Sequence, residues 1–149
     1  MGEDWYFVVR FAVLFRIIRG AGDMAVDHSF LIREGLIMSV YIVIRVDIRD
    51  RQAYGEYMLH TPRVANQYGG RFIARGGETE TLEGEKETLR IVLVEFPSMD
   101  DAKRFYRSEE YQAVKQLREG AGSAQFVAVD GYPVEDWDKA LEVSKGLSL

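Results

Sequence analysis

The chain has 149 residues, a formal net charge of −5 at pH 7 and a hydrophobic fraction of 47%, which is typical of one folded domain and too apolar for a disordered chain. The negative charge argues against nucleic acid as a partner, because phosphate binding needs a basic surface. Cysteine is absent and only two histidines occur, so cysteine-based and histidine-rich metal sites are excluded. We expect no metal, no cofactor and a cytoplasmic location.

Residues 1–37 precede the point, at Met38, where a regular pattern begins. Arginines interrupt the apolar run 5–18, whereas a membrane-spanning helix needs about 20 largely uncharged residues, so we expect no membrane span. Glu3 and Asp4 stand where a signal peptide carries positive charge. The residues just before Met38 read like a translated ribosome-binding site. We expect an N-terminal extension that is poorly ordered or comes from a misassigned start. A membrane-peripheral arm and an unassigned structured element are the alternatives.

The first predicted elements are a strand and a helix. Residues 40–47 alternate β-branched side chains with other types, which predicts a strand. Asp50 is suited to cap the helical pattern of residues 51–68. Pro62 predicts a kink or a restart within this helix, because proline removes a backbone donor. Gly69–Gly70 predicts the end of the helix.

A hairpin and a second helical region follow. Residues 71–76 predict a strand that continues loosely to Leu82, and residues 89–96 predict the next strand. Ser98 is suited to cap a helix, which Ser108 breaks and caps again. The helical pattern ends near Gly120, and residues 125–130 predict the last strand.

The order strand, helix, strand, strand, helix, strand predicts an α+β domain of the ferredoxin-like βαββαβ plan. It has a four-stranded antiparallel sheet with both helices on one face. We expect this domain to span residues 38–132 and residues 133–149 to form a C-terminal tail. The strands also carry apolar residues on the second face, so we expect two copies to pair as a homodimer.

The chain resembles the family called domain of unknown function 1330, within the dimeric α+β barrel superfamily. The resemblance covers about residues 38–132 and rests on Ala74-Arg75-Gly76-Gly77, Val94-Glu95-Phe96-Pro97-Ser98, Phe105-Tyr106 with Ser108, Tyr111-Gln112, and Arg118. The superfamily includes cofactor-independent monooxygenases, lactone isomerases and plain binding proteins. The resemblance therefore implies a barrel formed by two copies of the domain. It implies no specific activity, because one fold can carry many unrelated functions.

Arg75 and Glu95 form the first candidate site. A hairpin centred on Glu85 would place them opposite one another on neighbouring strands. Arg75 could then hold a carboxylate or enolate while Glu95 accepts a proton. The alternative is a structural ion pair within a dimer interface. Arg45 would lie beside Glu95 as a second partner of that carboxylate.

His60 and four tyrosines complete the candidate site. His60 could shuttle protons, or it could be a solvated histidine near a break in the helix. The tyrosines at helical spacing are Tyr54, Tyr57, Tyr106 and Tyr111. They could line a ligand pocket or form ordinary core. Gly76–Gly77 predicts a bulge or a close backbone approach and not a phosphate loop.

Three hypotheses for the function remain open. The first is a small homodimeric protein with a small-molecule pocket between its sheet and helices. The second is a cofactor-free enzyme, catalysing proton transfer, isomerisation or monooxygenation of a small carbonyl or phenolic compound. The third is an interaction module without a ligand.

Overall fold

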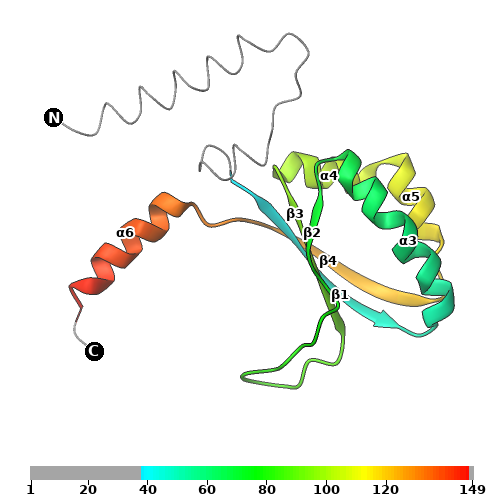
Figure 1. Ribbon diagram of the computed structural model, residues 1–149, viewed down its shortest axis with the longest axis horizontal. Coiled ribbons are helices and arrows are strands. Elements are labelled where there is room, and N and C mark those ends of the chain that lie inside the picture. The colour runs from blue at the N-terminus through cyan, green and yellow to red at the C-terminus, as the bar shows by residue number, and fades with distance from the viewer. Residues whose placement is uncertain (1–37, 148–149) are drawn as a thin grey trace, which may run out of the picture. The chain divides into compact units, whose positions relative to one another are not determined.

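The computed structural model describes residues 38–147 of the chain. Their helices and strands are β1 (Val40–Ile48), α3 (Arg51–Gln67), β2 (Arg71–Arg75), β3 (Arg90–Phe96), α4 (Met99–Arg107), α5 (Glu109–Gln116), β4 (Gly122–Asp130) and α6 (Val134–Lys145). The strands form one antiparallel sheet in the order β2-β3-β1-β4, and α3, α4 and α5 cover one of its faces (Figure 1). The expected ferredoxin-like α+β plan is confirmed.

β1 lies inside the sheet and supplies the floor of the core. It pairs antiparallel with β3 on one side and with β4 on the other. Its alternate residues Val40, Ile42, Ile44 and Val46 are all buried beneath the helices. Period-two alternation of this kind is expected where one face of a strand packs against helices.

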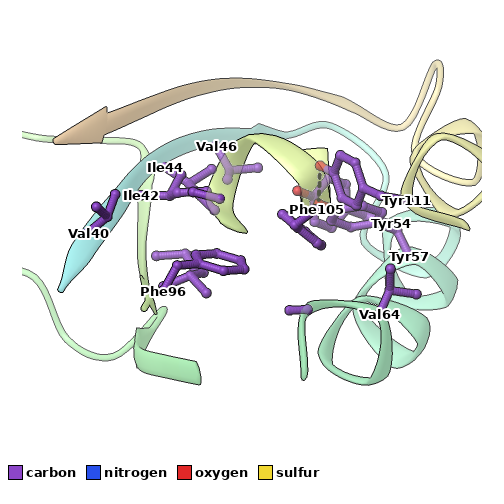
Figure 2. Close-up of a cluster of buried hydrophobic side chains, with 14 of the residues drawn as sticks. Val40, Ile42, Ile44, Val46, Tyr54, Tyr57, Val64, Phe96, Phe105 and Tyr111 are labelled. Carbon is purple, nitrogen blue, oxygen red and sulfur yellow. Dashed lines mark hydrogen bonds between the residues drawn. The ribbon is translucent and has the colours of Figure 1, made fainter. Parts of the chain in front are cut away.

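Aromatic rings from the helices complete the core (Figure 2). The ring of Phe105, on α4, lies 5.1 Å from that of Phe96 and 4.4 Å from that of Tyr111. Phe96 and Tyr111 are fully buried, each with 0% of its surface exposed. These rings join the end of β3 to both α4 and α5, so one aromatic cluster fixes the position of the helices over the sheet.

α3 begins at its expected cap and runs through its proline. The Asp50 carboxylate accepts hydrogen bonds from the backbone amides of Gln52 and Ala53, at 2.9 and 3.0 Å. Of the two expectations at Pro62, a restart of the helix is wrong, because the helix is continuous over Arg51–Gln67. Pro62 has no amide to donate to the Met58 carbonyl four residues earlier. The Arg75 guanidinium donates to that carbonyl instead.

Two serines set the boundaries of α4 and α5, as expected. The Ser98 hydroxyl accepts from the Asp101 amide at 3.1 Å and donates to the Asp101 carboxylate at 2.6 Å. Ser108 ends α4 and also caps α5, since its hydroxyl accepts from the Tyr111 amide at 3.1 Å. One residue thus closes one helix and opens the next.

Two expectations for the sheet need correction. β2 ends at Arg75, so its expected continuation to Leu82 is wrong. β4 begins at Gly122, three residues before the strand expected from propensity, because pairing with β1 outweighs the weak β preference of Gly122 and Ser123. The tail, residues 133–149, contains the helix α6.

Candidate functional site

A small cavity lies between the sheet and α3. Its volume is about 30 Å³, room for very few water molecules. It is bounded by the helix-facing side chains of β1 and β3, by Phe72, Phe105 and Phe126, and by Tyr54, Tyr57, Met58, Thr61, Arg75 and Arg90. Among the residues described, Arg75 and Arg90 are the charged groups on its wall. Three of the predicted site residues therefore meet here: Tyr54, Tyr57 and Arg75.

A second, larger hollow adjoins this cavity. Its volume is about 470 Å³, and its wall is mostly polar, with Asp47, Arg51, Gly77, Thr79 and Glu87 among its lining residues. It shares Val46, Met58 and Arg90 with the inner cavity. These three side chains form the partition between the apolar cavity and the polar hollow.

The position of the Arg90 side chain in this partition depends on Gly76, which has no side chain to obstruct it. Gly76 has a φ of 65°, and a Cβ there would lie 2.2 Å from the Arg90 guanidinium carbon. The Arg90 guanidinium also donates to the Arg75 carbonyl at 3.1 Å. The expected close backbone approach at Gly76–Gly77 is therefore confirmed at Gly76. The bulge of this strand lies earlier, between Phe72 and Ala74.

Two tyrosines from α3 and α5 meet beside the cavity. The Tyr57 and Tyr111 hydroxyl oxygens are 3.1 Å apart and share a hydrogen bond (Figure 2). Burial raises the pKa of Tyr111 far above its ordinary value, and burial followed by the neighbouring Tyr57 raises the pKa of Tyr54 to about 12. The phenols of Tyr54 and Tyr111 are therefore neutral at physiological pH and act as hydrogen-bond donors.

Arg118 lies against this pair and is buried, with 7% of its surface exposed. Its guanidinium carbon is 5.4 Å from the centre of the Tyr57 ring and 5.5 Å from that of Phe126. Burial acts to lower its pKa, but Tyr57 and Tyr111 outweigh that effect, so the pKa is raised and the group stays charged. Its Nε has no hydrogen-bond partner in the structure. Residues 38–147 place no carboxylate within ion-pair distance of it.

The cluster of Tyr57, Tyr111 and Arg118 has more donors than acceptors, even with the hydrogen bond between the Arg118 guanidinium and the Tyr111 hydroxyl counted. In the bond between the two phenols one proton is used, so one phenolic proton is left over. The Arg118 Nε–H group is also left over. Buried donors without acceptors are costly and uncommon in native proteins, and each such group calls for an explanation.

In the sequence, Arg118 stood out only as one of the residues that carry the family resemblance. The structure instead places it just past α5, whose C-cap is Leu117, and turns it into the core. An arginine near a helix C-terminus is usually solvated. Nothing in the local pattern signals burial here, because the environment is made by Tyr57 and Phe126, which lie on two other elements, α3 and β4.

The expected pairing of Arg75 with Glu95 is wrong. Glu95 lies opposite Arg71, and the bulge between Phe72 and Ala74 then shifts the register, so that Arg75 lies opposite Val92. Residues 95 and 92 of a strand face opposite ways. Arg75 therefore lies on the helix-covered face, with its guanidinium carbon 4.9 Å from the centre of the Phe72 ring.

Glu95 lies on the other face of the sheet, away from the cavity. Its carboxylate accepts from Ser39 Oγ at 2.8 Å and from Arg71 Nη2 at 2.6 Å. Only 8% of its surface is exposed. Sequence reasoning missed both partners, because Ser39 lies before the recognised strand pattern and Arg71 was placed out of register.

The remaining predicted residues lie outside the cavity wall. Arg45 pairs with Glu87 at 2.8 Å, and not with Glu95 as expected, because β1 places it opposite Ile91. The His60 side chain is 58% exposed, with its Nε2 4.0 Å from a Glu56 oxygen, as a solvated histidine would be. Tyr106 packs on Tyr111 and Phe126, at 5.4 and 5.6 Å between ring centres.

Two searches of the described residues gave negative results. Residues 38–147 contain no group of three or more His, Asp or Glu side chains arranged to hold a metal ion. None of the helices in this part of the chain is long and apolar enough to cross a membrane.

A protein of unknown function from Rhodopseudomonas palustris is 16% identical, covers 73% of this chain and 95% of its own, and superposes with a TM-score of 0.54. SnoaB, a cofactor-independent oxygenase from Streptomyces nogalater, is 13% identical over 64% of this chain and 94% of its own, with a TM-score of 0.43. A dimeric protein of unknown function with a ferredoxin-like fold from Bacteroides fragilis is 18% identical over 62% of this chain and 96% of its own, with a TM-score of 0.38. No curated protein matches.

The family match agrees with the fold and covers all four strands of the sheet and the three helices that cover it. The model of the family described as Domain of unknown function (DUF1330) matches residues 39–132, and the chain belongs to that family.

Proposed function

We propose that the protein binds a small planar compound with an anionic oxygen, such as a carboxylate, enolate or phenolate, between its sheet and α3. The observation that carries this proposal is the surplus of donors at Tyr57, Tyr111 and Arg118. An anionic oxygen would accept both the leftover phenolic proton and the Arg118 Nε–H. The aromatic and aliphatic wall of the cavity would take the apolar part of the compound.

Entry of such a compound requires the partition to move. The inner cavity, at about 30 Å³, is far smaller than the ~150 Å³ cavity that admits benzene in an engineered protein. Met58 and Arg90 separate it from the hollow of about 470 Å³. Both are long side chains with several rotatable bonds. Rotation of these two side chains would join the two spaces.

A binding protein is favoured over an enzyme by the position of the basic groups. The carboxylate of Glu95 lies on the opposite face of the sheet, and His60 lies in solvent. Neither can take a proton from a compound in the cavity, since general bases act within hydrogen-bond reach. A cofactor-free enzyme remains the second candidate, because a guanidinium and two phenolic hydroxyls can stabilise an oxyanion.

The proposal can be tested by comparing two small compounds, benzoate and benzyl alcohol, which have the same aromatic ring but differ in charge. We expect millimolar benzoate to raise the melting temperature and benzyl alcohol to raise it less, because ligand binding to the folded state adds RT ln(1 + [L]/Kd) to stability. Differential scanning fluorimetry followed by isothermal titration calorimetry measures both. Equal shifts with the two probes, or no shift with benzoate, salicylate and acetylacetone, would contradict the proposal and favour an interaction module.

We further propose that the protein is a homodimer in which the second sheet faces pack together. This face presents Val43 and Leu93 at the centre of the sheet, with Val127 and Val129 on β4 each 49% exposed and Ile73 45% exposed. Apolar side chains gathered on one sheet face call for a covering partner.

The dimer has a direct mutational test. We expect Val127→Lys with Val129→Lys to convert a dimer into a monomer in sedimentation velocity at micromolar concentration, because two charges would be buried without partners. Leu59→Lys is the matched control: Leu59 is 73% exposed on α3, away from this face, and its replacement should leave the dimer intact. A wild-type chain that sediments as a monomer would refute the proposal.

A further inference from the structure

α6 carries an apolar stripe that, within residues 38–147, is not packed against the hydrophobic core. One side of the helix is formed by residues that lie three or four positions apart, namely Trp137, Ala140, Leu141 and Ser144. Trp137 is 55% exposed and Leu141 is 37% exposed. Asp136 and Asp138 flank the stripe on its two sides. α6 also lies outside residues 39–132, the part of the chain that the family model matches.

A groove with an apolar floor and basic residues in its lining lies between α4 and β4. Its volume is about 300 Å³, twice that of the ~150 Å³ cavity that admits benzene in an engineered protein. Its lining is Ile42, Ala102, Lys103, Tyr106, Arg107, Phe126 and Ala128. The floor is apolar, and Ala128 is exposed although it points to the helix-covered side of the sheet. The end of β4 is therefore left uncovered by α4.

The charges around the groove and along the helix are complementary. Lys103 and Arg107 stand on its rim, and Lys115 lies over the Tyr106 ring, 5.7 Å from its centre. Residues 38–147 provide no ion-pair partner for these three cations. On α6, Asp138 also has none, and Asp136 has only the exposed Lys139 at 3.8 Å. The two aspartates next to Trp137 on α6 are thus complementary in charge to Lys103 and Arg107 next to the aromatic floor of the groove.

The groove of the same copy is out of reach of α6. Gly131 continues the β4 ladder, since its amide donates to the Ser39 carbonyl at 2.7 Å. Pro133 is extended as well, with φ −62° and ψ 136°. Only Tyr132 remains to reverse the chain, and its hydroxyl donates to the Asp136 carbonyl at 3.3 Å across the first turn of α6. Lying in its own groove would require α6 to run back along β4, which this extended connection does not permit.

We propose that α6 docks into the α4–β4 groove of a second copy of this chain, with Trp137 over Tyr106 and Phe126 and with Asp136 and Asp138 against Lys103 and Arg107. In a symmetric pair each copy offers one helix and one groove, so the contact is made twice. The inference is independent of any ligand in the cavity, and it adds a second contact to a dimer formed through the sheets.

The experiment follows Trp137 in the full chain. The chain has two tryptophans, so Trp5→Phe leaves Trp137 as the one reporter. We expect its emission to be blue-shifted and its acrylamide quenching to be several-fold weaker at micromolar concentration than after dilution to the monomer. Lys103→Glu with Arg107→Glu should return Trp137 to the exposed state. Arg63→Glu with Lys86→Glu, which reverses two charges away from the groove, should not.

Mixing two variants identifies the partner. The first keeps Trp137 and carries Lys103→Glu with Arg107→Glu. The second has an intact groove and lacks both tryptophans, through Trp5→Phe and Trp137→Ala. Adding the second to the first should restore protection of Trp137, because the groove of another copy becomes available. Protection that persists in the monomer, or that the charge reversal leaves unchanged, overturns the proposal, as does a Trp137 that is fully exposed at every concentration.

Discussion

The Arg118→Met protein should lose anion binding and keep, or gain, stability. Arg118 is a buried cation without a carboxylate partner in residues 38–147, and its Nε has no acceptor. Apolar replacement of buried charges is often stabilising by about 1–4 kcal/mol. Stacking on Tyr57 and Phe126 offsets about 0.5–1 kcal/mol of that gain. We expect the free energy of unfolding to rise by about 1 kcal/mol.

Binding should respond in the opposite direction. A hydrogen bond to a charged group contributes about 1.5–3 kcal/mol, so benzoate should bind about 10- to 100-fold more weakly to the Arg118→Met protein. Urea unfolding and calorimetric titration measure the two quantities. Arg104→Met is the matched control, since Arg104 is an exposed arginine paired with Asp101, and its replacement should leave benzoate binding unchanged. A large loss of stability in Arg118→Met with unchanged binding would show that Arg118 serves the fold.

Arg75 and Pro62 should be coupled in stability. Arg75 donates to the Met58 carbonyl, the group that Pro62 leaves without its helical partner. We expect Arg75→Met to lower the free energy of unfolding by about 1 kcal/mol, the usual net contribution of a hydrogen bond. Pro62→Ala should raise it by up to about 3 kcal/mol, because alanine restores the helical amide and removes the proline ring. In the Pro62→Ala background, Arg75→Met should cost almost nothing.

The double-mutant cycle measures this coupling, which we expect to be about 1 kcal/mol. Arg63→Met is the matched control: Arg63 is an exposed arginine next to Pro62, and its replacement should show no coupling. If the changes in unfolding free energy caused by Arg75→Met and Pro62→Ala simply add, Arg75 does not compensate for the amide that Pro62 lacks. The same proteins also test its role at the site, since Arg75→Met should weaken benzoate binding less than Arg118→Met does.

The sheet and its covering helices could be predicted because their signals are local. The alternation of residues 40–47, the caps at Asp50, Ser98 and Ser108, and the Gly69–Gly70 stop each lie within a few residues of the element they define. The βαββαβ order then follows, and it leaves few alternative topologies.

The candidate site could not be predicted at the same level, because it depends on register and on distant contacts. The Arg75–Glu95 pairing assumed a regular hairpin, and one extra residue in β2 was enough to break it. The burial of Arg118 depends on Tyr57 and Phe126, which precede and follow it in the chain. Tyr54 and Tyr57 line the inner cavity because helical spacing turns both toward the sheet, and their role in a ligand pocket stays a prediction.

The bulge in β2 has a consequence for how the sequence of this strand is interpreted. Arg71 and Arg75 are four residues apart, a spacing that gives two side chains the same orientation in any regular strand. Here Ile73 adds half a period, so Arg71 contacts Glu95 on one face while Arg75 contacts Met58 on the other. One inserted residue shifts the alternation of side chains along the strand, so two arginines that would share one face lie on opposite faces. Each arginine can therefore change without constraint from the other, although a pattern of spacing alone would treat them as equivalent.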